Sequence, residues 1–115
     1  MNVNFNTLTF GVRIAEGYDK IRDVFIYANE RKFRQNISPY EFCNELNKVL
    51  PDENDLVKFK EVDHHPENLN CFFGGEITTK GQVFPFKIFA SYIKGTKIMS
   101  NNIIKNIKEI IGYQG

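Results

Sequence analysis

The residues best suited to chemistry gather in one stretch, VDHHPENLNCFFGGE, which spans residues 62–76. It holds both histidines of the chain, His64 and His65, and also Cys71, one of two cysteines. Histidine serves as a general base or a metal ligand, and a cysteine thiolate is a nucleophile or a ligand. A metal site, a nucleophilic cysteine and a histidine-pair active site are therefore the three chemistries to weigh.

The sequence context favours none of these three sites. Neighbouring residues of an extended segment point to opposite sides, and zinc needs about three or four protein ligands. Glu67 and Cys71 are candidates to complete a metal site, but their spacing matches no standard motif. Cys71 lies in an apolar stretch, where a cysteine behaves as a small hydrophobic residue. We therefore predict a polar loop at 63–68, with no catalytic residue, no metal and no cofactor.

A short segment of this stretch resembles a known enzyme family. DHHPEN, residues 63–68, is similar to the D-H-H-P segment of the pterin-4a-carbinolamine dehydratases, which are small α+β proteins. The resemblance implies an active site that uses His64 and His65. The further downstream histidine of that family has no counterpart here, because the chain has two histidines in all. The family's segment also follows a helix, whereas a strand is predicted here.

The composition is that of one folded domain. The chain has 115 residues, of which 42% are hydrophobic and 25% charged, as in ordinary globular proteins. We assign residues 1–115 to a single domain. The start has no signal-peptide pattern, no apolar run is long enough to span a membrane, and two cysteines form no disulfide framework. We therefore expect a cytoplasmic protein with no membrane partner.

Charge is distributed unevenly along the chain, although the net charge is only +1. Residues 35–70 contain three basic residues and eight acidic ones, namely Glu41, Glu45, Asp52, Glu53, Asp55, Glu61, Asp63 and Glu67. If these carboxylates share one face, they can bind a basic protein partner. Tyr40 and Tyr92 are candidate aromatic anchors. The one basic cluster, residues 31–34, is too small for a nucleic-acid site, so no direct nucleic-acid contact is expected.

Sequence patterns predict an α+β fold. The strands are expected at 8–14, 24–27, 55–62, 69–78 and 83–93, and the helices at 39–50 and 100–111. Ser38, Pro39 and Glu41 form a capping box at the start of the first helix. Gly74-Gly75 indicates a bulge or a close backbone approach. The prediction is an antiparallel sheet of about five strands, in the order ββαβββα, with two amphipathic helices on one face.

The pattern as a whole resembles the small immunity proteins of bacterial competition systems, including contact-dependent growth inhibition. The similar features are the size, the composition rich in Asn, Lys and Ile, the acidic segment, and VFIYANERKFR leading into a capped helix. The resemblance implies a non-enzymatic protein that covers the active site of a cognate toxin, often a basic nuclease. Two alternatives stay open: a phage-encoded inhibitor such as an anti-CRISPR protein, and the dehydratase-like enzyme. The sequence does not predict the oligomeric state.

Overall fold

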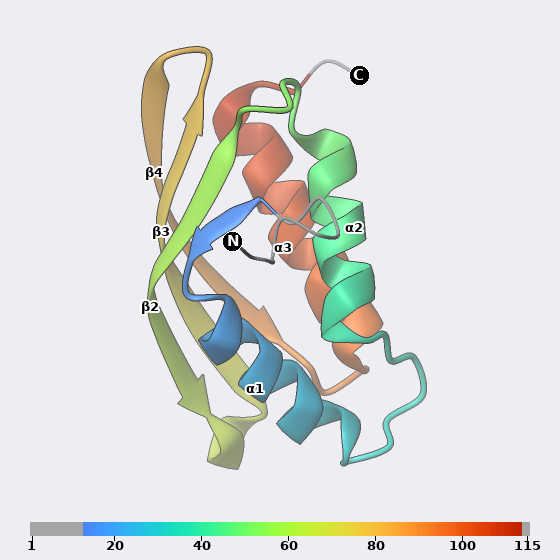
Figure 1. Ribbon diagram of the computed structural model, residues 1–115. Helices are drawn as coiled ribbons and strands as arrows, with labels where there is room; N and C mark the ends of the chain where they lie inside the picture. The colour runs from blue at the N-terminus through green and yellow to red at the C-terminus, as the bar shows by residue number, and fades with distance from the viewer. Residues whose placement is uncertain (1–12, 114–115) are drawn as a thin grey trace, which may run out of the picture.

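The computed structural model describes residues 13–113 and contains one mixed sheet with three α-helices. The elements are β1 (Ile14–Glu16), α1 (Tyr18–Asn29), α2 (Pro39–Val49), β2 (Leu56–His65), the 3-10 helix η2 (Pro66–Asn68), β3 (Asn70–Thr79), β4 (Gln82–Ser91) and α3 (Thr96–Ile111). The sheet order is β1-β2-β3-β4, with β1 parallel to β2 and the other neighbours antiparallel. The three α-helices lie on one face of the sheet (Figure 1).

The α+β class is confirmed, but the finer prediction is wrong in three respects. The described sheet has four strands rather than about five, it is mixed rather than antiparallel, and three α-helices cover it rather than two. The order ββαβββα is likewise not the observed one. Most of the strand expected at 8–14 lies outside the described residues, and only its last residue, Ile14, falls within β1.

The strand predicted at 24–27 is instead part of α1. The prediction followed the β-branched and aromatic residue types, but the spacing of the apolar residues decides the structure. The buried residues Ile21, Val24, Phe25 and Ala28 recur at i, i+3, i+4 and i+7, which is the helical period. Gly17 starts the helix at φ 89°, where an added Cβ would lie 2.8 Å from the Cβ of Phe59. The chain therefore turns tightly against β2 before α1 begins.

The helix predicted at 39–50 is confirmed as α2. The backbone N–H of Glu41 donates to the Ser38 hydroxyl at 3.0 Å, and the Ser38 N–H donates to the Glu41 carboxylate at 3.1 Å. This capping box satisfies two of the donors left open at a helix start. The buried face of α2 consists of Phe42, Cys43, Leu46 and Val49.

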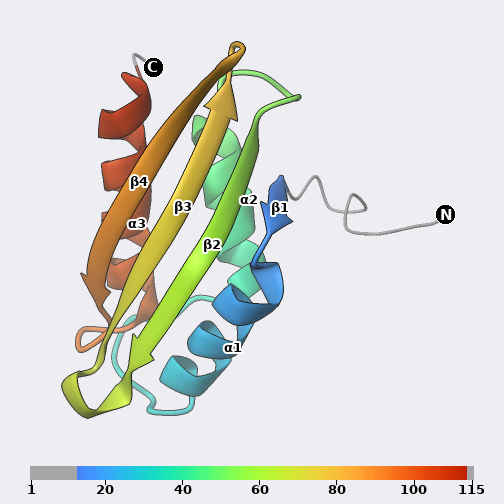
Figure 2. The ribbon, with the colours of Figure 1, turned by 90° about the vertical axis from the view of Figure 1, so that its left-hand side faces the viewer.

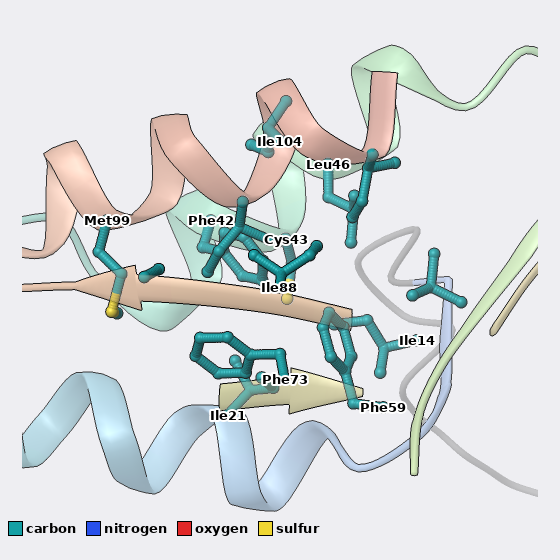
Figure 3. Close-up of a cluster of buried hydrophobic side chains, with 14 of the residues drawn as sticks. Ile14, Ile21, Phe42, Cys43, Leu46, Phe59, Phe73, Ile88, Met99 and Ile104 are labelled. Atoms are coloured by element: carbon teal, nitrogen blue, oxygen red, sulfur yellow. The ribbon is translucent and has the colours of Figure 1, made fainter. Parts of the chain in front are cut away.

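The helix predicted at 100–111 begins earlier, at Thr96, so Ser100 is a buried residue within α3. Its last residue is Ile111, as predicted, and Gly112 follows in the left-handed conformation. Figure 3 shows how the layers meet: Ile21 of α1, Phe42 and Leu46 of α2, and Met99 and Ile104 of α3 lie over Phe59, Phe73 and Ile88 of the sheet.

An irregularity in β2 decides which side chains face the helices. Phe59 pairs with Gly75 and Glu61 pairs with Gly74, so Lys60 is an extra residue opposite the glycine pair. Of the two alternatives predicted for Gly74-Gly75, the bulge lies instead on the neighbouring strand β2, opposite the glycines. The close approach is confirmed, because a Cβ on Gly75 would lie 2.9 Å from the carbonyl carbon of Lys58 and overlap its oxygen.

The extra residue changes the alternation along β2. Before the bulge the buried residues are odd-numbered, Val57 and Phe59, whereas after it Val62 and His64 are the more buried ones. Glu61 and Asp63 consequently point to the face that lies away from the helices. The bulge thus determines the face to which each later side chain of β2 belongs.

Candidate functional site

The two histidines lie in β2 and η2 begins directly after them, so the loop predicted at 63–68 is wrong for residues 63–65. They project to opposite faces of the sheet, because neighbouring strand residues alternate. Nε2 of His64 lies 2.8 Å from the Tyr92 hydroxyl, and the His64 ring meets Tyr27 of α1 edge to face at 4.8 Å. Nδ1 of His65 lies 3.8 Å from the Glu67 carboxylate on the other side. The single site that the dehydratase resemblance requires of both imidazoles is not formed.

The surroundings of His64 favour its neutral form. Burial lowers the pKa of His64 below its ordinary value, the neighbouring His65 lowers it further, and Glu67 partly offsets both. Cys71 pairs with His64 across the strands, but it is fully buried, and that burial raises its pKa to about 12. A thiol with such a pKa is not a nucleophile near neutral pH. Residues 13–113 contain no group of three or more His, Cys, Asp or Glu that could hold a metal ion.

The acidic residues proposed to bind a partner do not share one face. Glu41 and Glu45 are exposed on α2, on the helical side of the sheet, whereas Glu61 and Asp63 lie on the opposite side. Glu45 is paired with Lys48 at 2.9 Å. The sheet separates the two groups, so the continuous acidic face that we considered is not formed.

The remaining acidic candidates lie at the two ends of β2. Asp52 and Glu53 precede the strand, and Glu67 follows it in η2. Asp55 is only 2% exposed, and its carboxylate accepts the backbone N–H of Asp52 at 2.9 Å. Asp55 therefore shapes the turn before β2 and contributes no surface. Tyr40 is exposed on α2, while Tyr92 is fully buried and cannot anchor a partner.

A different surface emerges from the described residues, namely the sheet face that no described helix covers (Figure 2). We call it the open face. Its main side chains are Leu56, Lys58, Glu61 and Asp63 of β2, Phe72 and Glu76 of β3, and Val83, Pro85, Lys87 and Phe89 of β4. Phe89 is 76% exposed, and its ring packs on that of Phe72 with 4.9 Å between centroids. Such exposure is unusual for so large an apolar side chain.

The open face carries balanced charge around this aromatic pair. Lys58 and Lys87 of the face, together with Lys60 at the bulge beside it, supply three positive charges, and Glu61, Asp63 and Glu76 supply three negative ones. The Lys60 ammonium lies 3.3 Å from the Glu76 carboxylate. Next to the aromatic pair is a shallow hollow of about 430 Å³ over Gly74, where the strand has no side chain. The face therefore combines a projecting ring, a hollow and fixed charges of both signs.

The sequence contained a signal for this surface that residue-type motifs do not capture. One set of alternate residues in the strand predicted at 83–93 is apolar, and its members are buried or partly buried in the structure, namely Phe84, Phe86, Ile88, Ala90 and Tyr92. The positions between them include three further apolar residues, Val83, Phe89 and Ile93, so the sequence alone does not determine whether the second face of the strand is covered. In the described structure all three are exposed.

Comparisons of the chain with protein-family models, curated proteins and solved structures give no match. None of the helices between residues 13 and 113 is long and apolar enough to cross a bilayer. Any functional inference about the open face or the His64–Tyr92 contact therefore depends on their geometry alone.

Proposed function

We propose that this chain is a non-enzymatic protein-binding domain that receives its partner on the open face. The observation that supports it is the aromatic pair, in which Phe89 is 76% exposed and held by Phe72. Burying such a ring on binding is worth roughly 1.5–3 kcal/mol. Aromatic side chains at the centre of a patch are the usual anchors of protein interfaces.

The shape and charge of the open face favour a protein over other ligands. Small molecules bind in concave pockets that enclose most of their surface, whereas the hollow over Gly74 is shallow. Aromatic pairs on sheets also stack nucleic-acid bases. Here Glu61, Asp63 and Glu76 stand among the lysines, so the face has no net positive charge to hold phosphates.

Neutralisation of a basic toxin is a narrower form of this proposal. Glu61 and Asp63 lie next to the aromatic pair, since Asp63 pairs with Phe72 across the strands. They are the acidic residues of the open face that have no lysine partner among residues 13–113. A basic toxin would bury the aromatic pair and bind these two carboxylates. An anti-CRISPR-type inhibitor would use the same surface on a different target.

The test is co-purification of a tagged chain from cells that also produce the proteins encoded next to it, at low and high salt. Phe89→Ser removes the anchor, and Ile26→Ser is the matched control, because Ile26 is 47% exposed on α1, away from the open face. We expect a stoichiometric partner with the wild type and with Ile26→Ser but not with Phe89→Ser. A partner that Phe89→Ser retains would exclude the open face. The absence of any other protein at both salt concentrations would count against a partner encoded next to this chain.

A further inference from the structure

We propose that the partner on the open face is a second copy of this chain, packed face to face about a two-fold axis that runs along β3. This inference rests on the proposed function and names the partner. A two-fold interface is built from the same patch on both copies, so the patch must be complementary to itself. The open face meets this requirement in charge, in apolar contacts and in size.

One pair of opposite charges on the open face matches under this rotation, whereas Glu76 on the central strand comes opposite Glu76 of the partner subunit, with its charge offset by the Lys60 ammonium at 3.3 Å. Turning a second copy about an axis along β3 places β2 of each copy over β4 of the other. Residues that pair across β2, β3 and β4 form a row, and the rotation places each row over the same row of the other copy. Glu61, Gly74 and Lys87 form one such row, with the acid on β2 and the lysine on β4. Glu61 therefore comes opposite Lys87 of the partner subunit, and Lys87 comes opposite Glu61 of the partner subunit. Neither side chain has an ion-pair partner of its own among residues 13–113.

The apolar side chains match in the same arrangement. Leu56, Thr78 and Val83 form another row, so Leu56 comes opposite Val83 of the partner subunit. Both side chains are exposed in the single chain. Phe72 lies on the central strand and meets Phe72 of the partner subunit at the axis. Phe89 packs on Phe72 and comes opposite Asp63 of the partner subunit, so it is covered at the side of the paired Phe72 rings.

Size and net charge also favour a second copy. Three strands of ten residues offer roughly 500 Å² of sheet at spacings of about 4.8 Å between strands and 3.4 Å per residue. This lies below the roughly 800 Å² per partner of a standard interface, so we expect a dimer in the micromolar range. The chain carries a net charge of only +1, so two copies scarcely repel each other.

The test is sedimentation velocity on the purified chain over a concentration series. We expect a micromolar dimer that Ile26→Ser leaves unchanged and that Phe89→Ser weakens on the order of a hundredfold, because a two-fold interface loses the ring twice. Phe89 is exposed, so its replacement leaves the fold intact for the comparison. The inference would be overturned by a wild-type chain that stays monomeric at about 1 mM, or by a dimer whose dissociation constant Phe89→Ser does not change.

A charge exchange tests the axis itself. Glu61→Lys and Lys87→Glu should each weaken the dimer about tenfold or more, since each places like charges opposite one another at two points. The double variant restores opposite charges and should return the affinity to near that of the wild type. A double variant as weak as the sum of the two single variants would overturn the proposed axis.

The outcomes also separate this inference from the proposed function. If the purified chain is monomeric while the cellular co-purification yields another protein in a Phe89-dependent way, the second copy is wrong and protein binding stands. If Phe89→Ser changes neither measurement, both proposals fall.

Discussion

The replacement of Gly75 by alanine should destabilise the fold far more than the same change at its neighbour Gly74. A Cβ on Gly75 would lie 2.9 Å from the carbonyl carbon of Lys58, would overlap its oxygen and would come within 3.0 Å of the Phe86 ring. Backbone atoms cannot swing aside as a side chain does, so β2 and β3 must separate at the bulge.

The cost can be worked out from these contacts. Overpacking a filled interior costs about 1–3 kcal/mol, and each ladder hydrogen bond weakened by the separation adds about 0.5–1.5 kcal/mol. We therefore expect Gly75→Ala to cost about 2–4 kcal/mol of the free energy of unfolding. For a domain of this size the melting temperature should fall by roughly 10–20 °C.

Gly74→Ala is the matched control. Its Cβ would lie 3.2 Å from the Phe72 ring, which is a side chain on the open face and can shift by a few tenths of an ångström. Alanine also reduces the freedom of the unfolded chain, a gain of about 0.4–1 kcal/mol. We expect Gly74→Ala to stay within about 1 kcal/mol of the wild type. The measurement is urea unfolding of both variants in dilute solution, and equal effects at the two positions would refute the proposed strand contact.

Three other predictions concern stability. The free energy of unfolding of the wild type should fall as the pH is lowered from about 8 to 5.5. The pKa of His64 is lower in the folded chain than in the unfolded chain, so the unfolded chain binds more protons in this range. The urea midpoint of His64→Gln should therefore decline less over the same pH range than that of the wild type. Asp55→Ala should cost about 1–3 kcal/mol, because it removes the buried carboxylate that accepts the Asp52 N–H in a part-buried hydrogen bond. The exposed Asp63→Ala should stay within about 0.5 kcal/mol, and a similar loss in both variants by chemical unfolding would contradict this. Phe89→Ser should change the free energy of unfolding by no more than about 0.5 kcal/mol in dilute solution, and a larger loss would mean that the ring supports the fold.

The parts of the fold that local chemistry determines could be predicted from the sequence. The start of α2 depends on Ser38 and Glu41, whose hydrogen bonds form within one turn and need no distant partner, and on Pro39, whose fixed φ suits the first helical position. The turn at Lys80-Gly81 and the end of α3 at Gly112 are local in the same sense. In each case the residue types within one turn determine which backbone conformation is favourable.

The helix α1 shows where this local reasoning fails. Val24 to Tyr27 are β-branched or aromatic, and their intrinsic preference is for a strand. The same segment, however, places Ile21, Val24, Phe25 and Ala28 on one helical face, and packing that face against β2 and the other helices outweighs the preference. Unless the position of the sheet is known, the sequence does not determine whether this segment adopts the two-residue repeat of a strand or the 3.6-residue repeat of a helix. This error also changed the predicted strand order, because it replaced a helix with a strand.

The candidate site was hard to predict because it depends on an alternation that one extra residue reverses. A two-residue period continued from Val57 through Phe59 would turn Glu61 and Asp63 toward the helices and His64 toward solvent. The bulge at Lys60 does the opposite, and it exists because Gly74 and Gly75 on β3 let the backbones approach. The glycine pair was visible in the sequence, but its effect falls on a neighbouring strand whose register was not known. The exposure of Phe89 follows from the same sheet, since the three helices within residues 13–113 all pack on its other side. Of the residues that the sequence marked for chemistry, His64 and Cys71 contact the core side of the sheet, and the residues that we propose to bind a partner are ordinary strand positions whose exposure depends on which face the described helices cover.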